Sequence, residues 1–97
     1  MARRFKKSDG IVERKIHAEH LLVPIRKDVA DLNSLYTLNE VASFIWERAV
    51  EGLPEPEIVN RLSSAFQVDG ARAEKDTRRI LDELLSLGAL VAVPEPN

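Results

Sequence analysis

The chain has 97 residues, of which 44% are hydrophobic and 31% charged, and its formal net charge is −2. A chain of this length forms one small domain, and this balance of apolar and charged residues is typical of a folded chain rather than a disordered one. Because the sequence contains no cysteine, a disulfide framework, a thiolate metal site and a cysteine nucleophile are all excluded.

The positive charge is concentrated at the start of the chain. Four of the 14 basic residues lie within the first seven positions: Arg3, Arg4, Lys6 and Lys7. Positions 8–97 therefore hold 10 basic and 16 acidic residues, a formal charge of −6, which disfavours nucleic acid as a partner. We expect residues 1–10 to form a disordered basic tail, and an anchor for an acidic partner is the alternative.

Charged residues interleaved with β-branched ones predict strands in the first part of the chain. We expect these strands over residues 11–16, 19–25 and 31–38, with a turn at 17–19 and a polar connection at 26–30. Pro24 lies inside the second strand and cannot donate a hydrogen bond, so its position must face an edge or a bulge. Short loops between the strands indicate an antiparallel meander.

Apolar residues recur at helical spacing after the third predicted strand. The first helix is expected to begin at Asn39, a good N-cap, and a capping box from Thr37 to Glu40 is the alternative start. Gly52 supplies the left-handed residue that ends this helix. Trp46 lies on its apolar stripe, which predicts a core position.

Two further helices are predicted before the end of the chain. One covers residues 56–66 and the other residues 71–87, the latter capped by Asp69 and ended by Gly88. Residues 89–93 are expected to be a short extended segment. The inward face of the last helix is predicted to carry Ala73, Thr77, Ile80, Leu81, Leu84 and Leu87.

This order of elements predicts an α+β fold. A three-stranded antiparallel β-meander is followed by a three-helix bundle, an arrangement like a winged helix-turn-helix with the meander as the wing. We expect a single domain over residues 11–93, with a tail at 94–97.

The sequence shows no constellation of residues that performs catalysis. His17 and His20 are three positions apart across a predicted turn, without the further ligands that a metal site needs, and we expect two partly exposed histidines there. The serines and the four glycines form neither a nucleophile elbow nor a phosphate-binding loop. No apolar run approaches the about 18 residues of a membrane span. We expect a cytoplasmic, non-enzymatic protein with no cofactor, no metal and no membrane partner.

The outer side of the last predicted helix is rich in charge. In a winged helix that reads DNA this would be the recognition helix, so a regulatory DNA-binding module is the alternative function. Acidic residues interrupt the basic ones, which favours a solvated face with ion pairs one helical turn apart. The charged residues are Arg72, Lys75, Asp76, Arg78, Arg79, Asp82 and Glu83.

Residues 11–91 resemble the PqqD-like family of peptide chaperones, also called RiPP recognition elements. The resemblance rests on Leu38-Asn39-Glu40, Ile45-Trp46, Gly52, Ile58-Val59, Leu62, Asp76, Leu81, Leu84 and Gly88, with Arg14 and the segment 19–24 upstream. Family members that act in pyrroloquinoline quinone synthesis have a Pro-Glu-Gly motif before the first helix. This chain has Asn33-Ser34-Leu35 there, so the resemblance does not extend to that pathway.

The resemblance implies a groove between the third strand and the third helix. Family members bind there the leader of a ribosomally synthesised precursor peptide and present it to a modifying enzyme, often of the radical S-adenosylmethionine class. The implied binding residues are Leu32, Asn33, Ser34, Leu35, Tyr36 and Thr37 of the strand with Arg72, Asp76, Arg79, Ile80 and Glu83 of the helix. An open strand edge also allows two copies to pair, so a homodimer is left open.

Overall fold

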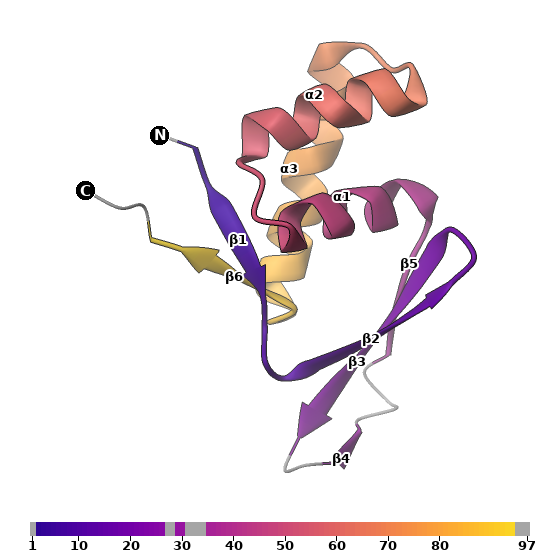
Figure 1. Ribbon diagram of the computed structural model, residues 1–97, viewed down its shortest axis with the longest axis vertical. Coiled ribbons are helices and arrows are strands. Elements are labelled where there is room, and N and C mark those ends of the chain that lie inside the picture. The colour runs from indigo at the N-terminus through magenta and orange to yellow at the C-terminus, as the bar shows by residue number, and fades with distance from the viewer. Residues whose placement is uncertain (1, 27–28, 31–34, 95–97) are drawn as a thin grey trace.

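The computed structural model describes residues 2–26, 29–30 and 35–94, and the chain forms six strands and three helices there (Figure 1). The strands are β1 (Arg4–Lys7), β2 (Ile11–Ile16), β3 (Glu19–Arg26), β4 (Val29–Ala30), β5 (Tyr36–Leu38) and β6 (Leu90–Val93). The helices are α1 (Glu40–Val50), α2 (Glu55–Phe66) and α3 (Gly70–Ser86). The predicted α+β class, an antiparallel sheet followed by three helices, is confirmed.

The main sheet has β3 at its centre. β2 pairs with one side of β3, and both β4 and β5 pair with the other side, all antiparallel. One strand over residues 31–38 was expected, but the pairing strand is the three-residue β5, and β4 lies within the predicted connection at 26–30. Residues 31–34 lie outside the described part of the chain.

Pro24 helps to explain this division of the third strand. The backbone N–H of Ile25 donates to the carbonyl of Gly10 at 2.8 Å, so Ile25 bonds toward β2. Hydrogen-bonded and non-hydrogen-bonded pairs alternate along an antiparallel ladder, so Pro24, opposite Ile11, turns its nitrogen to the other side of β3. There it lies between the residues that pair with β4 and those that pair with β5, where it has no N–H to offer a continuous ladder.

The expectation of a disordered tail over residues 1–10 is corrected by β1. This strand pairs antiparallel with β6 in a two-stranded ribbon at one side of the helices, with Phe5 opposite Ala92 (Figure 1). Phe5 is only 1% exposed and belongs to the main core cluster. Its burial stabilises an ordered segment, although the cations on either side of it are typical of a solvated tail.

The helix boundaries follow the predicted capping residues. The Asn39 side chain accepts a hydrogen bond from the backbone N–H of Ala42 at 2.9 Å, and Asp69 accepts one from Arg72 at 3.0 Å. Gly52 and Gly88 have φ of 89° and 76°, the left-handed conformation expected of residues that end helices. The capping signals therefore predicted the ends of α1 and α3 to within about two residues.

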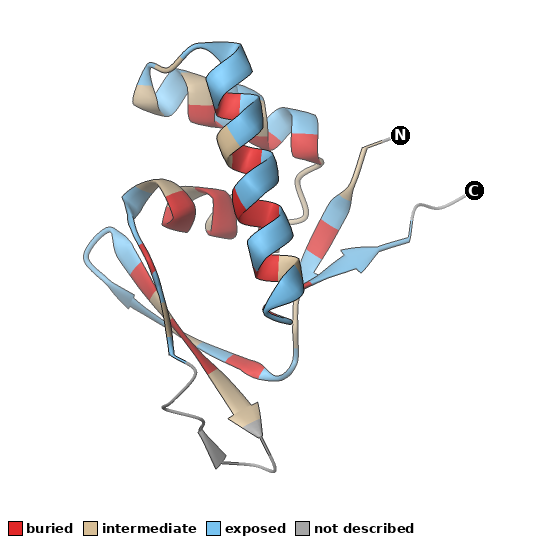
Figure 2. Ribbon diagram, turned by 180° about the vertical axis from the view of Figure 1, so that it is seen from behind, coloured by how far each residue is buried: buried red, intermediate tan, exposed pale blue. Residues whose placement is uncertain are grey.

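The core lies between the main sheet, the ribbon and the inner faces of the helices (Figure 2). Trp46 is completely buried, as predicted, and the inner side of α3 is buried from Ala73 to Leu84. Leu87 was expected inside but is 48% exposed, and it lies just past the end of α3 at Ser86 as the C-cap residue.

Candidate functional site

The strand β5 offers an open edge next to the helices. It pairs with β3 through the register Leu38 to His20, Thr37 to Leu21 and Tyr36 to Leu22. The alternation along β3 assigns the backbone hydrogen bonds of Tyr36 and Leu38 to β3, which leaves the N–H and C=O of Thr37 facing away. Within the described residues no strand pairs with this second edge of β5. β5 is therefore a place where another extended chain can complete the ladder.

A hydrogen bond joins β5 to α3. The Tyr36 hydroxyl donates to Glu83 Oε2 at 2.9 Å, and Glu83 also accepts from Arg79 at 3.3 Å. Because the bond to the Glu83 carboxylate favours the protonated phenol, and burial adds to this, the pKa of Tyr36 is raised above its ordinary value. Tyr36 thus stays a hydrogen-bond donor at neutral pH and holds the strand beside the helix.

The surface of α3 that starts at Glu83 is a ladder of alternating charges. Arg79 lies 3.3 Å from Glu83 and 4.0 Å from Asp76, and Asp76 lies 3.7 Å from Arg72. Exposed ion pairs of this kind contribute little to stability, so a ligand can exchange partners with them at small cost. Ile80, which is 6% exposed, supplies an apolar residue on the same stretch of helix.

The residues singled out from the sequence fall into three groups. Direct hydrogen bonds or ion pairs bring together Tyr36, Arg72, Asp76, Arg79 and Glu83, and Ile80 lies buried on the same helix. Leu35 and Thr37 are exposed at β5, and no recorded side-chain hydrogen bond or ion pair links them to α3. Leu32, Asn33 and Ser34 lie outside the described residues.

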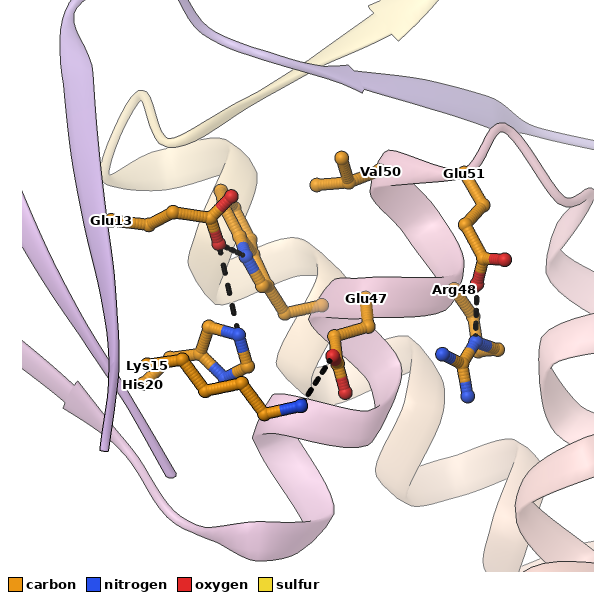
Figure 3. A pocket seen from close by; sticks show the side chains of 8 residues that line it. Glu13, Lys15, His20, Glu47, Arg48, Val50 and Glu51 are labelled. Atoms are coloured by element: carbon orange, nitrogen blue, oxygen red, sulfur yellow. Dashed lines mark hydrogen bonds and ion pairs between the residues drawn. The ribbon is translucent and has the colours of Figure 1, made fainter. Parts of the chain in front are cut away.

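A separate hollow of about 460 Å³ lies between β2, β3 and α1 (Figure 3). Inside it the Trp46 indole N–H donates to Glu13 Oε2, and His20 Nε2 lies 3.8 Å from the same oxygen. Lys15 Nζ pairs with Glu47 at 3.2 Å across the opening. These bonds tie the β2–β3 hairpin to α1, and no pattern in the sequence predicted them.

The two histidines occupy different environments. His17 is exposed in the turn of the hairpin, with a φ of 58°. His20 was expected to be partly exposed but is 4% exposed, because on β3 it faces inward, opposite Leu38 and beneath α1. Its Nδ1 has no hydrogen-bond partner among the described residues. The described chain brings no three His, Asp or Glu side chains together as metal ligands.

A second network joins α3 to the start of α2 and to Arg3, just before β1. Arg3 donates to both carboxylate oxygens of Glu55, at 2.9 and 3.2 Å, and to Asp82 at 2.9 Å. Arg78 lies 3.6 Å from Glu55. The hydrogen bonds from Arg3 hold the pKa of Glu55 below its usual range and raise the pKa of Arg3. Arg78, one of the candidate DNA contacts, is therefore already paired with a carboxylate.

None of the helices in the described part of the chain is long and apolar enough to span a bilayer.

Comparisons with known proteins agree with this architecture. The sequence pattern of the family described as coenzyme PQQ synthesis protein D (PqqD) matches residues 19–90. A search of curated proteins found no match. Among solved structures, TbiB1 in complex with the TbiA(beta) leader peptide is 28% identical, with a TM-score of 0.77, over 93% of this chain and 99% of that one. Lasso peptide synthetase B1 complexed with the leader peptide is 22% identical, with a TM-score of 0.75, over 94% and 99%. The latter, at this identity, supports the fold alone.

Proposed function

The chain belongs to the PqqD family, and from this premise we propose that it binds the leader of a ribosomally synthesised precursor peptide and presents it to a modifying enzyme. The observation that carries the proposal is the likeness over almost the whole chain to TbiB1, a protein solved with a leader peptide bound. The proposed role is that of a carrier that performs no chemistry itself. The family resemblance points to enzymes that are often of the radical S-adenosylmethionine class, and we propose that the receiving enzyme belongs to it.

We place the leader at the open edge of β5. A peptide that adds as a strand bonds to the free N–H and C=O of Thr37. Main-chain bonds of this kind are the same for every sequence. Specificity must therefore come from side chains next to the edge, and Tyr36 and α3 supply these.

The surface of α3 beside β5, together with Leu35, gives such a peptide both apolar and charged contacts. The exposed side chain of Leu35 provides apolar surface, whereas Ile80 is buried, and the ladder of Asp76, Arg79 and Glu83 provides charges of both signs. A leader that is disordered when free loses conformational entropy on binding. We expect this cost to hold the affinity near micromolar, about −8 kcal/mol, which allows release to the enzyme.

Duplex DNA is a poorer ligand for the same helix. On α3, Arg72 and Arg79 pair with Asp76, Arg79 pairs also with Glu83, and Arg78 pairs with Glu55. Phosphates would have to displace these carboxylates on a body of negative net charge.

The experiment compares two proline substitutions at open strand edges. Thr37→Pro removes the N–H at the free edge of β5, and Lys15→Pro makes the same change at the free edge of β2, so the second variant is the matched control. The probe is the fluorescently labelled leader of the precursor peptide encoded beside this chain's gene, with a scrambled leader as the negative control. Circular dichroism verifies that each variant is folded.

We expect the T37P variant to bind the leader at least about ten-fold more weakly than the wild type, and the K15P variant to bind within about two-fold of it. Equal binding by a folded T37P variant contradicts strand addition at β5. No binding by the wild-type chain contradicts the proposed function itself.

A further inference from the structure

The β1–β6 ribbon has one buried face and one exposed face. Phe5 of β1 and Leu90 of β6 are 1% and 2% exposed and pack into the core. Side chains alternate along a strand, so the other face carries Arg4, Lys6, Val91 and Val93, which we call the ribbon face. In the register, Arg4 lies opposite Val93 and Lys6 opposite Val91, so each cation adjoins a valine.

The ribbon face has a charge opposite to that of the rest of the chain. It holds two cations and no acid, while positions 8–97 have six more acidic than basic residues. Of the other N-terminal cations, Arg3 is bound by Glu55 and Asp82, and Lys7 lies 3.9 Å from Glu13. Arg4 donates to the neutral carbonyl of Gly52, and among the described residues neither Arg4 nor Lys6 has an ion-pair partner. Two uncompensated positive charges thus lie side by side on this face.

The same face carries exposed apolar surface. Val91 and Val93 are 43% and 36% exposed, and they are neighbours on one side of one strand. An apolar centre with a charged rim is typical of a surface that binds another protein.

The edge of β6 is also open. The Ser8 N–H donates to the Ala89 carbonyl at 2.9 Å, and the alternation from this pair directs the N–H and C=O of Leu90 and Ala92 away from β1. No described strand pairs with that edge, and β6 contains no charged residue to protect it. The edge of β1 differs, since it carries three cations and its Arg3 carbonyl accepts from the Glu55 N–H at 2.9 Å.

The ribbon and the β5 edge lie on opposite sides of the helices. Both ribbon views place β1 and β6 on one side of α1 and α3 and β5 on the other (Figures 1 and 2). A ligand on the ribbon therefore leaves the β5 edge accessible.

We propose that the ribbon face and the β6 edge form a docking surface for the enzyme that receives the peptide, and that they bind an acidic, aliphatic-centred segment of it. An extended segment that adds to β6 places alternate side chains beside Val91 and Val93, where aliphatic residues exclude water from the valines. Carboxylates at the margin of the segment neutralise Arg4 and Lys6. This inference rests on the proposed function, because it assumes that a receiving enzyme exists.

The experiment measures leader and enzyme binding separately. The probes are the labelled leader described above and the purified modifying enzyme encoded beside the same precursor peptide, each titrated at low and at physiological salt. The variants are Arg4→Glu with Lys6→Glu, the milder Lys6→Gln, and Arg14→Glu as the control. Arg14 is an exposed cation on β2, outside both surfaces.

We expect the double reversal to weaken enzyme binding more than about ten-fold at low salt, with a smaller loss for K6Q, while the leader affinity stays within about two-fold of the wild type. R14E should leave both affinities unchanged.

Enzyme binding that is insensitive to the double reversal and to K6Q, or absent from a wild-type chain that binds leader, overturns the docking surface and leaves the proposed function standing. Two other outcomes would assign the surface to a different partner and also overturn the proposal. One is a homodimer of the wild-type chain that a further variant, Val91→Asp, breaks apart. The other is DNA binding that the double reversal abolishes. Failure of the wild type to bind leader defeats the proposed function instead.

Discussion

Two of the open strand edges in the described part of the chain, those of β5 and β6, differ in what surrounds them. The β5 edge lies against α3, whose charges of both signs are paired among themselves and with Tyr36. The β6 edge has no described strand beside it, and the strand on its other side, β1, carries Arg4 and Lys6, which have no acidic partner among the described residues. The α3 surface, whose charges are paired, suits temporary binding of a peptide backbone. The cations near the β6 edge have no acidic partner, which suits docking of a negatively charged protein. If both proposals hold, one small domain binds the leader and the receiving enzyme at separate edges.

The largest expected effect tests whether the ribbon is part of the folded body. Phe5→Ala removes a fully buried ring from the core cluster, so we expect the free energy of unfolding to fall by about 3–4 kcal/mol in urea denaturation. A fall of less than about 1 kcal/mol in the free energy of unfolding would mean that the N-terminal segment behaves as a tail. In that case β1 would not hold β6 as part of the folded body.

A smaller effect is expected at the network that fastens the ribbon to the helices. Because the folded-state pKa of Glu55 is depressed, its carboxylate stabilises the fold above the ordinary glutamate pKa, and this contribution is lost as the pH falls through the depressed value. We expect Glu55→Gln to cost about 1–2 kcal/mol at pH 7, and the gap from wild type to close as the pH falls through the ordinary glutamate pKa and below the depressed value.

The control for this pH dependence is Glu57→Gln. Glu57 lies on the same helix and pairs with Arg61 at 3.0 Å, but both side chains are exposed. We expect this change to cost less than about 0.5 kcal/mol. The free energy of unfolding of both variants is measured by urea denaturation at a series of pH values. An equal loss of stability in the two variants would contradict the claim that the Glu55 carboxylate stabilises the fold more than an exposed ion pair does.

The bond between β5 and α3 should be visible in a titration. The chain has a single tyrosine, so the absorbance of tyrosinate reports Tyr36 alone. Because the folded-state pKa of Tyr36 is raised, the stabilisation is complete below the ordinary tyrosine pKa and is lost as the pH rises through the raised value. We expect the midpoint to lie above about 10 in the wild type and to move down in Glu83→Gln. An unchanged midpoint in Glu83→Gln would contradict the hydrogen bond from Tyr36 on β5 to Glu83 on α3.

The smallest expected effect concerns the exposed side of the ribbon. Val91→Ser changes a side chain that is 43% exposed and absent from the core cluster, so we expect the free energy of unfolding to change by less than about 0.5 kcal/mol. Thermal unfolding of Val91→Ser, measured alongside Phe5→Ala and the wild type, compares the stability of the three proteins. A large loss would show that Val91 supports the fold and is not free for a partner.

Local signals were sufficient to predict the helices. Asn39 and Asp69 cap α1 and α3 through contacts three residues away, and Gly52 and Gly88 end them through their own backbone conformation. The charge ladder of α3 was predictable for the same reason, since its members are three or four residues apart on one helix.

Contacts between distant segments could not be predicted in this way. Phe5 is a single apolar residue among cations, and only its partner strand at the other end of the chain explains its burial. His20 is buried by α1, and the Trp46 indole reaches Glu13 across 33 positions. At the candidate site, the strand residue Tyr36 and the helix residue Glu83 were both identified from the sequence, but their hydrogen bond spans 47 positions and required the fold.

The most direct test of the central claim is amide hydrogen exchange at Thr37 with and without bound leader. The Thr37 N–H faces the open edge of β5, whereas those of Tyr36 and Leu38 are assigned to the ladder with β3. We expect saturation with leader to slow exchange at Thr37 at least about ten-fold and to leave the open-edge amide of Lys15 on β2 unchanged. Unchanged exchange at Thr37 in a chain saturated with leader would contradict strand addition at β5.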